Sequence, residues 1–443
     1  MTDPRALPSS AIVRWARAVP IIFLVVGFGF GSWLGRLPSI RDELGASAAQ
    51  MSVYGLCLAA GSILGLVISG RLVQHFGPRN ILLIGTILTT LALPGAAAVI
   101  LHVSILAGLT LLLLYGVALS ISDVAMNVSG ANAEVALGRT RMPLMHAGYS
   151  LGAVAATALG ALAERFGVPV PLHLAVVMVA GAALLLAMLR ALPRDEEALR
   201  ASGTAATTGP IPLVDSASGQ QPAFTSVTGS LPVQSGEPQA AVRDPSSKPH
   251  ARDPYSPWRD PRIILIGVMA LAFGLFEGTA ADWLPLALID GRGISNELGS
   301  TMLSVFFVSV MAVRIAGSWL IGRLGRVGAL RLSAIVAAVG IALTIAAPGA
   351  AGAVMGVVAW GLGTGLGWPI AISASADRPE TAARSVAAVS AIGYGSMLVG
   401  PFAFGFLGDQ IGLLVAFWAL IPFAAYVVFA ARASRQATRQ RLG

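Results

Sequence analysis

The sequence predicts an all-α integral membrane protein with twelve transmembrane helices arranged as two pseudo-symmetric six-helix bundles. Of its 443 residues, 56% are hydrophobic and only 11% are charged, whereas soluble domains contain about 25% charged residues. Apolar stretches of roughly the 20 residues that cross a bilayer recur along the chain. Six precede and six follow a long polar break, at residues 18–38, 50–73, 80–101, 104–128, 142–164, 169–191, 262–288, 299–322, 328–347, 349–374, 384–408 and 412–432.

The domain boundaries follow from this pattern. Residues 1–17 are expected to be a cytoplasmic N-terminal tail, 18–192 the first bundle, 262–433 the second bundle and 434–443 a cytoplasmic C-terminal tail. The break at 193–261 is rich in Pro, Ser, Gly, Thr and Ala and has almost no periodic apolar pattern. Such a segment cannot bury enough surface to fold alone. We therefore expect a disordered cytoplasmic linker.

The basic residues predict the orientation. Of the 29 Lys and Arg residues, one lies in a span (Arg314) and four lie in the predicted outer loops if the N-terminus is cytoplasmic. The remaining 24 then face the cytoplasm, as the positive-inside rule requires. The four outer residues are Arg36, Arg41, Arg165 and Arg292. We expect a multi-pass protein of a bacterial-type inner membrane with both termini inside, and the net charge of +8 reflects this topology rather than a nucleic-acid partner.

The two halves of the chain repeat each other. The loop after span two reads GRLVQHFGPR from Gly70, and the loop after span eight reads SWLIGRLGRV from Ser318, which aligns Gly77 with Gly325. The pairs LP, GY and LGALAERFG/FGFLGDQIG recur at offsets that stay between 245 and 248 residues. Chance similarity of apolar segments would not keep a constant offset. A duplicated six-helix unit is the simplest explanation.

These features resemble the major facilitator superfamily, which has twelve spans, a long central cytoplasmic linker and a G-x-L-x-D-R-x-G-R-R/K type of loop after spans two and eight. Gln74 and Gly322 stand here where the family has an acidic residue. The resemblance implies a monomer in which these loops form a cytoplasmic gate, with arginines that meet acidic groups and helix C-terminal carbonyls. The matching positions are Gly70, Leu72, Gly77 and Arg79 in the first loop, and Leu320, Arg323, Gly325 and Arg326 in the second.

Span four carries a small and polar stripe. Asp123 and Asn127 form a D-x-x-x-N element that resembles the fucose-permease-like branch, although Val128 replaces the proline of that branch and span one lacks an acidic residue. Together with Gly116, Ser120 and Gly130, these residues share one helical face. Such a face belongs on a cavity or on a tight helix contact. We expect Asn127 in the substrate cavity. Asp123 is expected either to act in proton coupling or substrate binding, or to form a structural hydrogen bond or salt bridge near the cytoplasmic gate.

Four more ionisable residues lie in spans. Glu277 is the deepest acidic residue and is the best candidate for the central cavity and for proton coupling. Asp282, also a cavity candidate, is about 140° further around the helix, so the two should not form a carboxylate dyad. Arg314 cannot remain unpaired in a dry interior and should form an ion pair, structural or switching, with Glu277, Asp282 or Asp123. His146 is either a proton relay or a packing residue.

Aromatic side chains offer surfaces for a ring or an apolar group. The Trp368-Pro369 pair interrupts span ten, and broken helices often line transporter sites. The cavity candidates are Trp33, Tyr149, Trp283, Trp368 and Tyr394, and Trp360 is a further aromatic side chain that could stack on a solute.

The predicted function is secondary active transport of a small solute by alternating access. A proton-coupled uptake of a polar solute, such as a sugar or polyol, is favoured; a proton-coupled drug or metabolite efflux antiporter and a non-transporting receptor are the alternatives. No GxxxxGK[ST] or HExxH motif occurs, and Cys57 is the only cysteine, so no nucleotide-driven pump, catalytic residue, metal site or cofactor is expected. The expected partners are the solute, protons and the lipid bilayer.

Overall fold

The computed structural model describes residues 9–137, 141–193, 255–378 and 381–435. Helices α1 to α7 form the first half of the molecule, and η2 with α9 to η4 form the second half. The bounds in the first half are α1 Ser9–Leu34, α2 Leu37–Leu44, α3 Ala48–Phe76, α4 Pro78–His102, α5 Ile105–Leu137, α6 Met142–Arg165 and α7 Val170–Leu189. Those in the second half are η2 Pro257–Arg259, α9 Pro261–Arg292, α10 Asn296–Ala346, α11 Gly349–Thr364, α12 Gly367–Ser375, α13 Ala382–Ile411, α14 Leu413–Ala416, η3 Phe417–Leu420, α15 Ile421–Ala430 and η4 Ala431–Ser434.

The twelve predicted spans are confirmed within the described residues. Ten continuous stretches are long and apolar enough to cross a membrane. One of them, α10, contains two spans that meet at Gly325, where the backbone leaves the helix (φ 66°, ψ 170°), and α6 supplies the twelfth span. Most of the predicted linker, residues 194–254, and most of the predicted C-terminal tail lie outside the described residues.

The first helix begins earlier than predicted, at Ser9 instead of residue 18. Trp15 explains the difference, because its side chain is 1% exposed and its Nε1 donates to Oγ of Ser129 at 3.0 Å. Arg14 and Arg17 lie on the exposed side of the same turns. The predicted tail therefore includes an amphipathic extension of the first span.

Glycines with positive φ mark equivalent turns in the two halves. Only glycine adopts this backbone region at little cost. The three pairs end equivalent helices and are separated by 248, 248 and 245 residues: Gly45 (φ 58°) and Gly293 (66°), Gly77 (77°) and Gly325 (66°), and Gly167 (62°) and Gly412 (85°). The chain thus turns at matching points in both halves, as a duplication requires.

Small residues bring the helices of the first half into backbone contact. A Cβ on Gly61 of α3 would meet the Leu113 carbonyl of α5, and a Cβ on Gly152 of α6 would meet the Leu24 carbonyl of α1. Association of helices within a membrane relies on such close packing because lipid is as apolar as the side chains.

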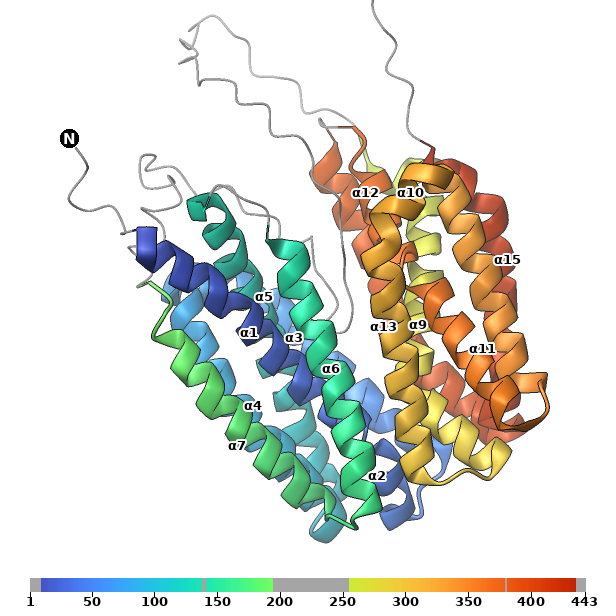
Figure 1. Cartoon of the computed structure of the whole chain (residues 1–443), viewed down its shortest axis with the longest axis horizontal. Coiled ribbons are helices and arrows are strands. Elements are labelled where there is room, and N and C mark those ends of the chain that lie inside the picture. The colour runs from blue at the N-terminus through green and yellow to red at the C-terminus, as the bar shows by residue number, and fades with distance from the viewer. Residues whose placement is uncertain (1–8, 138–140, 194–254, 379–380, 436–443) are drawn as a thin grey trace, which may run out of the picture.

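The two halves stand side by side in Figure 1, where they meet near α2 and diverge toward the end at which α1 begins. Helix α6 packs on α10, and α3 packs on α13. We call the two ends of the molecule the α2 end and the N-terminal end.

Gly61→Ala should destabilise the protein by about 1–3 kcal/mol, because the added methyl group overpacks a backbone contact. Gly322→Ala is the matched control, since this exposed helical glycine has open space around its Cβ position. Thermal unfolding of both purified variants in detergent checks the difference. Equal melting temperatures would contradict the close packing of α3 on α5.

Candidate functional site

A cavity lies between the two halves. Residues of α1, α2 and α3 form one wall, and residues of α9 and α13 form the other. This part has a volume of about 90 Å³ and the adjoining part about 290 Å³, and together they reach the lower end of the range for small-molecule sites. Its charged and aromatic lining residues are Phe30, Trp33, Glu277, Asp282 and Trp283.

The cavity continues toward the N-terminal end. There it is lined by α3 and α5 from the first half and by α13 from the second. Ser62 and Met397 line both parts, so the two parts adjoin. The second part places Asp123 and Ser120 opposite Tyr394. We call the two parts together the central cavity.

An ion pair between Arg314 and Glu277 lies at the wall of the central cavity. Arg314 on α10 places Nη2 3.0 Å from Oε2 of Glu277 on α9. Both residues are buried, with exposed fractions of 4% and 5%. Of the three carboxylates considered from the sequence, Glu277 is the one that Arg314 contacts.

Arg314 also satisfies a carbonyl at the break in span ten. Helix α11 ends at Thr364 and α12 begins at Gly367. In a continuous helix the Gly365 carbonyl would accept from the amide of residue 369, but Pro369 has no N–H. Arg314 Nε donates to this carbonyl instead, at 3.1 Å. One guanidinium therefore connects the carboxylate of span seven with the break in span ten.

Asp123 and Asp282 bring two further carboxylates to the central cavity. Asp123 is 7% exposed and Asp282 is half-buried. Within the described part of the chain, neither carboxylate group has a hydrogen bond or an ion pair. Glu277 and Asp282 line the same cavity, yet Glu277 is engaged by Arg314.

Three predicted residues of the first half lie outside the lining of the central cavity. The side-chain amide of Asn127 turns back and donates to the carbonyl four residues earlier, at 2.9 Å. His146 is buried and packs edge-to-face on Phe23 with ring centroids 5.0 Å apart, and its Nε2 has no hydrogen-bond partner among the described residues. Tyr149 is 4% exposed and lies where α6 meets α1.

The predicted aromatic residues divide into two groups. Trp33, Trp283 and Tyr394 line the central cavity. Trp368 packs behind Tyr394, with ring centroids 5.6 Å apart. Trp360 belongs to the core of the second half, between two phenylalanines.

Hydrogen bonds and ion pairs join the two halves at the α2 end. Nη1 of Arg41 lies 2.6 Å from Oδ2 of Asp290, and the Ser304 and Thr157 hydroxyls are 2.8 Å apart. We call this set of contacts the α2-end seal. Its other members are Asn296 with Asp42 and Glu164, Ser300 with the Gly35 carbonyl, and Arg165 with Glu297. The sequence places Arg41 and Arg165 in predicted outer loops but does not indicate their partners.

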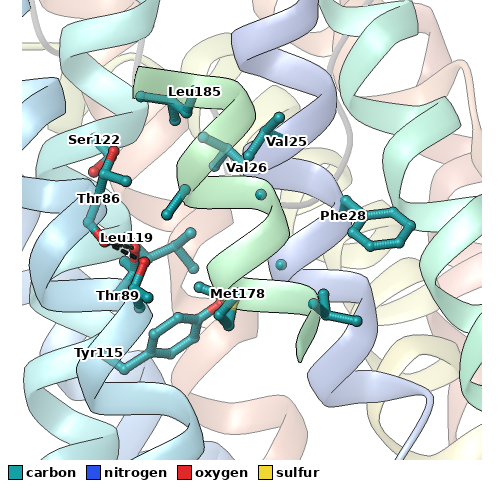
Figure 2. Close-up of a pocket in the computed structure, with 15 residues that line it drawn as sticks. Val25, Val26, Phe28, Thr86, Thr89, Tyr115, Leu119, Ser122, Met178 and Leu185 are labelled. Atoms are coloured by element: carbon teal, nitrogen blue, oxygen red, sulfur yellow. Dashed lines mark hydrogen bonds between the residues drawn. The ribbon is translucent and has the colours of Figure 1, made fainter. Parts of the chain in front are cut away.

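A second cavity lies inside the first bundle, between α1, α4, α5 and α7 (Figure 2). Figure 2 shows the Tyr115 hydroxyl directed toward Met178, and this hydroxyl has no hydrogen-bond partner among the described residues. The residues that line this cavity include no charged side chain and none that lines the central cavity. The central cavity, which combines charges with surfaces from both halves, is therefore the candidate site.

A model of the Major Facilitator Superfamily matches residues 19–401. The chain belongs to the Major Facilitator Superfamily. An uncharacterised transporter of Sinorhizobium fredii is 28% identical over 423 residues, which is 95% of this chain and 98% of the relative.

Three solved structures share the superfamily fold with this chain. The nucleoside transporter NupG has a TM-score of 0.68 at 14% identity and covers 95% of this chain and 98% of its own. A D-xylose–proton symporter has a TM-score of 0.65 at 16% identity, with coverage of 96% and 97%. The fucose permease FucP in its outward conformation has a TM-score of 0.57 at 14% identity, with coverage of 96% and 100%.

The two superfamily loops make contacts of the expected chemical kind. Arg79 Nε donates to the Leu189 carbonyl at the C-terminus of α7, at 3.1 Å. Arg326 Nη1 lies 2.6 Å from Oδ1 of Asp377, just after α12. Each of these contacts stays within one half of the molecule. The glycines of both loops, Gly77 and Gly325, supply the positive φ that starts the next helix.

The remaining two gate candidates in these loops, Gly70 and Arg323, make no hydrogen bond or ion pair between the halves in the described structure. Gly70 continues helix α3, and the Arg323 guanidinium lies 4.9 Å from the centre of the Trp319 ring. A gate between the halves at this end stays a prediction.

Arg314→Ala should lower the free energy of unfolding by about 3–5 kcal/mol, because it leaves the Glu277 carboxylate buried without a cation. Adding Glu277→Gln should recover part of this loss. Arg432→Ala, which removes an exposed arginine, is the control and should have little effect. The melting temperatures of the three variants provide the measurement, and a double variant less stable than Arg314→Ala would contradict direct pairing.

Proposed function

We propose that this superfamily transporter imports a small polar solute, such as a sugar or polyol, together with protons. The observation that carries the proposal is the central cavity between the halves, which combines a buried ion pair with two carboxylates that have no partner among the residues the structure describes. Ionisable groups inside a membrane are costly and usually mark ion or substrate pathways. A purely structural bundle would gain nothing from carboxylates that face a cavity.

The proposed orientation places the α2 end outside and the N-terminal end in the cytoplasm of a bacterial inner membrane. The distribution of basic residues supports it. With this orientation, the α2-end seal closes the outer side while the halves diverge on the inner side (Figure 1). The conformation is then an inward-facing one. Transport requires a second conformation in which the seal opens and the inner side closes.

The proposed coupling uses Glu277 and Arg314. A proton on Glu277 removes the negative charge that holds Arg314, and the guanidinium remains hydrogen-bonded to the Gly365 carbonyl at the break in span ten. A change at span seven can thereby reach α11 and α12. The two conformations must differ in their affinity for the proton and the solute for this to drive transport. Asp123, which lies deeper toward the N-terminal end, is the second proposed proton carrier.

Proton movement in proteoliposomes that enclose a pH-sensitive dye tests the coupling. Sugars, polyols, nucleosides and cationic drugs are added in turn; nucleosides and xylose are included because structural neighbours transport them. We expect one polar solute to drive proton entry, and we expect Asp123→Asn or Glu277→Gln to abolish it. Asp409→Asn, which alters an exposed carboxylate on α13, should leave the flux unchanged.

The direction of the proton flux separates the alternatives. Proton exit on drug entry would favour the antiporter over the symporter. Solute uptake without proton movement would exclude proton coupling and leave the transporter assignment intact.

A disulfide across the α2-end seal should stop transport. The hydroxyls of Thr157 and Ser304 are 2.8 Å apart, so Thr157→Cys with Ser304→Cys, in a Cys57→Ser background, places two thiols close together. Oxidation should block solute exchange, and a reductant should restore it, because the seal must open in each cycle. Each single cysteine variant is the control. Full exchange by the oxidised protein would show that the seal does not open.

A further inference from the structure

We propose that the transported solute carries a protonated amine together with hydroxyl groups, and that Asp282 binds the amine. This inference rests on the proposed function and specifies the substrate class of the same cavity. It follows from the charges and the unsatisfied hydrogen-bonding groups at the cavity wall.

The charge of the central cavity is negative. Asp123, Glu277 and Asp282 line it, and no arginine or lysine is among the described residues that do so. Arg314 approaches from behind and contacts Glu277, which leaves two carboxylates. A carboxylate in a partly dry site needs a proton or a cation. With a neutral solute the carboxylate depends on a proton, whereas a cationic solute supplies the counter-charge itself.

Asp282 is better placed than Asp123 to bind a cation from the solute. Asp123 is buried, whereas Asp282 is half-buried in the part of the cavity lined by α1, α2, α3, α9 and α13. Trp33 and Trp283 line the same part, and aromatic rings attract an organic cation. A bare metal ion would need several oxygen ligands, whereas the neighbouring lining residues are largely apolar. An organic ammonium group matches both the charge and the rings.

Two buried polar groups in the same part of the cavity indicate hydroxyl groups on the solute. The Trp283 Nε1–H and the Ser396 hydroxyl have no hydrogen-bond partner among the described residues, although Trp283 is 2% and Ser396 3% exposed. Buried polar groups almost always have a partner. The indole N–H can only donate, so a hydroxyl oxygen of the solute is the kind of acceptor that would satisfy it.

Ligand-induced stabilisation of the purified full-length protein tests this inference. Melting temperatures are measured with compounds that carry a basic amine and with their neutral counterparts. Glucosamine is compared with glucose and N-acetylglucosamine, N-methylglucamine with sorbitol, and ethanolamine with ethylene glycol. A ligand that binds the folded state raises the melting temperature, and at a fixed ligand concentration the rise grows with the logarithm of its affinity. We expect an amine to bind at least about 10-fold more tightly than its neutral counterpart, as a charged hydrogen bond allows.

Three variants assign the effect to named groups. Asp282→Asn should remove the 10-fold preference for the amine, whereas Asp409→Asn should retain it. Trp283→Phe keeps an aromatic ring but loses the N–H. It should therefore weaken the binding of the hydroxylated amines several-fold and leave the binding of ethylamine, an amine without a hydroxyl group, unaffected. Equal binding of amines and neutral compounds, an amine preference that persists in Asp282→Asn, or stabilisation by Na⁺ alone would overturn the inference.

The outcome is independent of proton coupling, because binding in detergent needs no gradient. Amine binding without solute-driven proton flux would support the substrate class and contradict the proposed coupling. Proton flux driven by a neutral sugar, with no amine bound, would contradict the substrate class and support the coupling.

Discussion

The buried guanidinium of Arg314 is the constraint around which the second half is built. A charge at this depth is costly unless a counter-charge and hydrogen-bond acceptors lie close to it. Glu277 supplies the counter-charge, and the Gly365 carbonyl, which Pro369 leaves without its helical donor, supplies an acceptor. The break in span ten and the acidic residue in span seven are therefore parts of one arrangement. Through the Arg314 side chain, the local geometry of span ten depends on the charge of Glu277 in span seven.

The contacts of the α2-end seal are weaker than the buried ion pair of Arg314 and Glu277. Asp290 is half exposed even when paired with Arg41, and ion pairs in contact with water contribute only about 0–1 kcal/mol each. The hydroxyl contact between Thr157 and Ser304 adds a net contribution of about 1 kcal/mol. Contacts of this size can be broken and remade at modest cost. Separating the buried pair of Arg314 and Glu277 would cost far more free energy than breaking the seal. The halves can therefore separate at the seal while each half remains intact.

Sequence periodicity predicted the spans and much of the cavity for a physical reason. The apolar length of each span and the polar face of each helix are local properties. The sequence alone therefore indicates Asp123, Glu277, Asp282, Trp33 and Trp283, which line the central cavity, and their roles in transport stay a prediction. The contacts that the sequence leaves open are non-local. Asn127 shares the face of Asp123, yet its amide bonds to its own helix, and Trp368 lies one ring behind the cavity. A helical face shows which residues avoid lipid, but only packing shows which of them meet empty space.

The arginines that are predicted exceptions to the positive-inside rule indicate where specific contacts form. Each of the four arginines predicted to lie in outer loops has a specific partner: Arg36 with Glu164, Arg41 with Asp290, Arg165 with Glu297, and Arg292 with carbonyls at the end of α10. Two of these contacts cross between the halves. A basic residue on the outer side opposes the preferred topology, so it persists where a local contact offsets that cost. In a duplicated transporter, residues that violate the topology rule are therefore the first places to look for contacts between the halves.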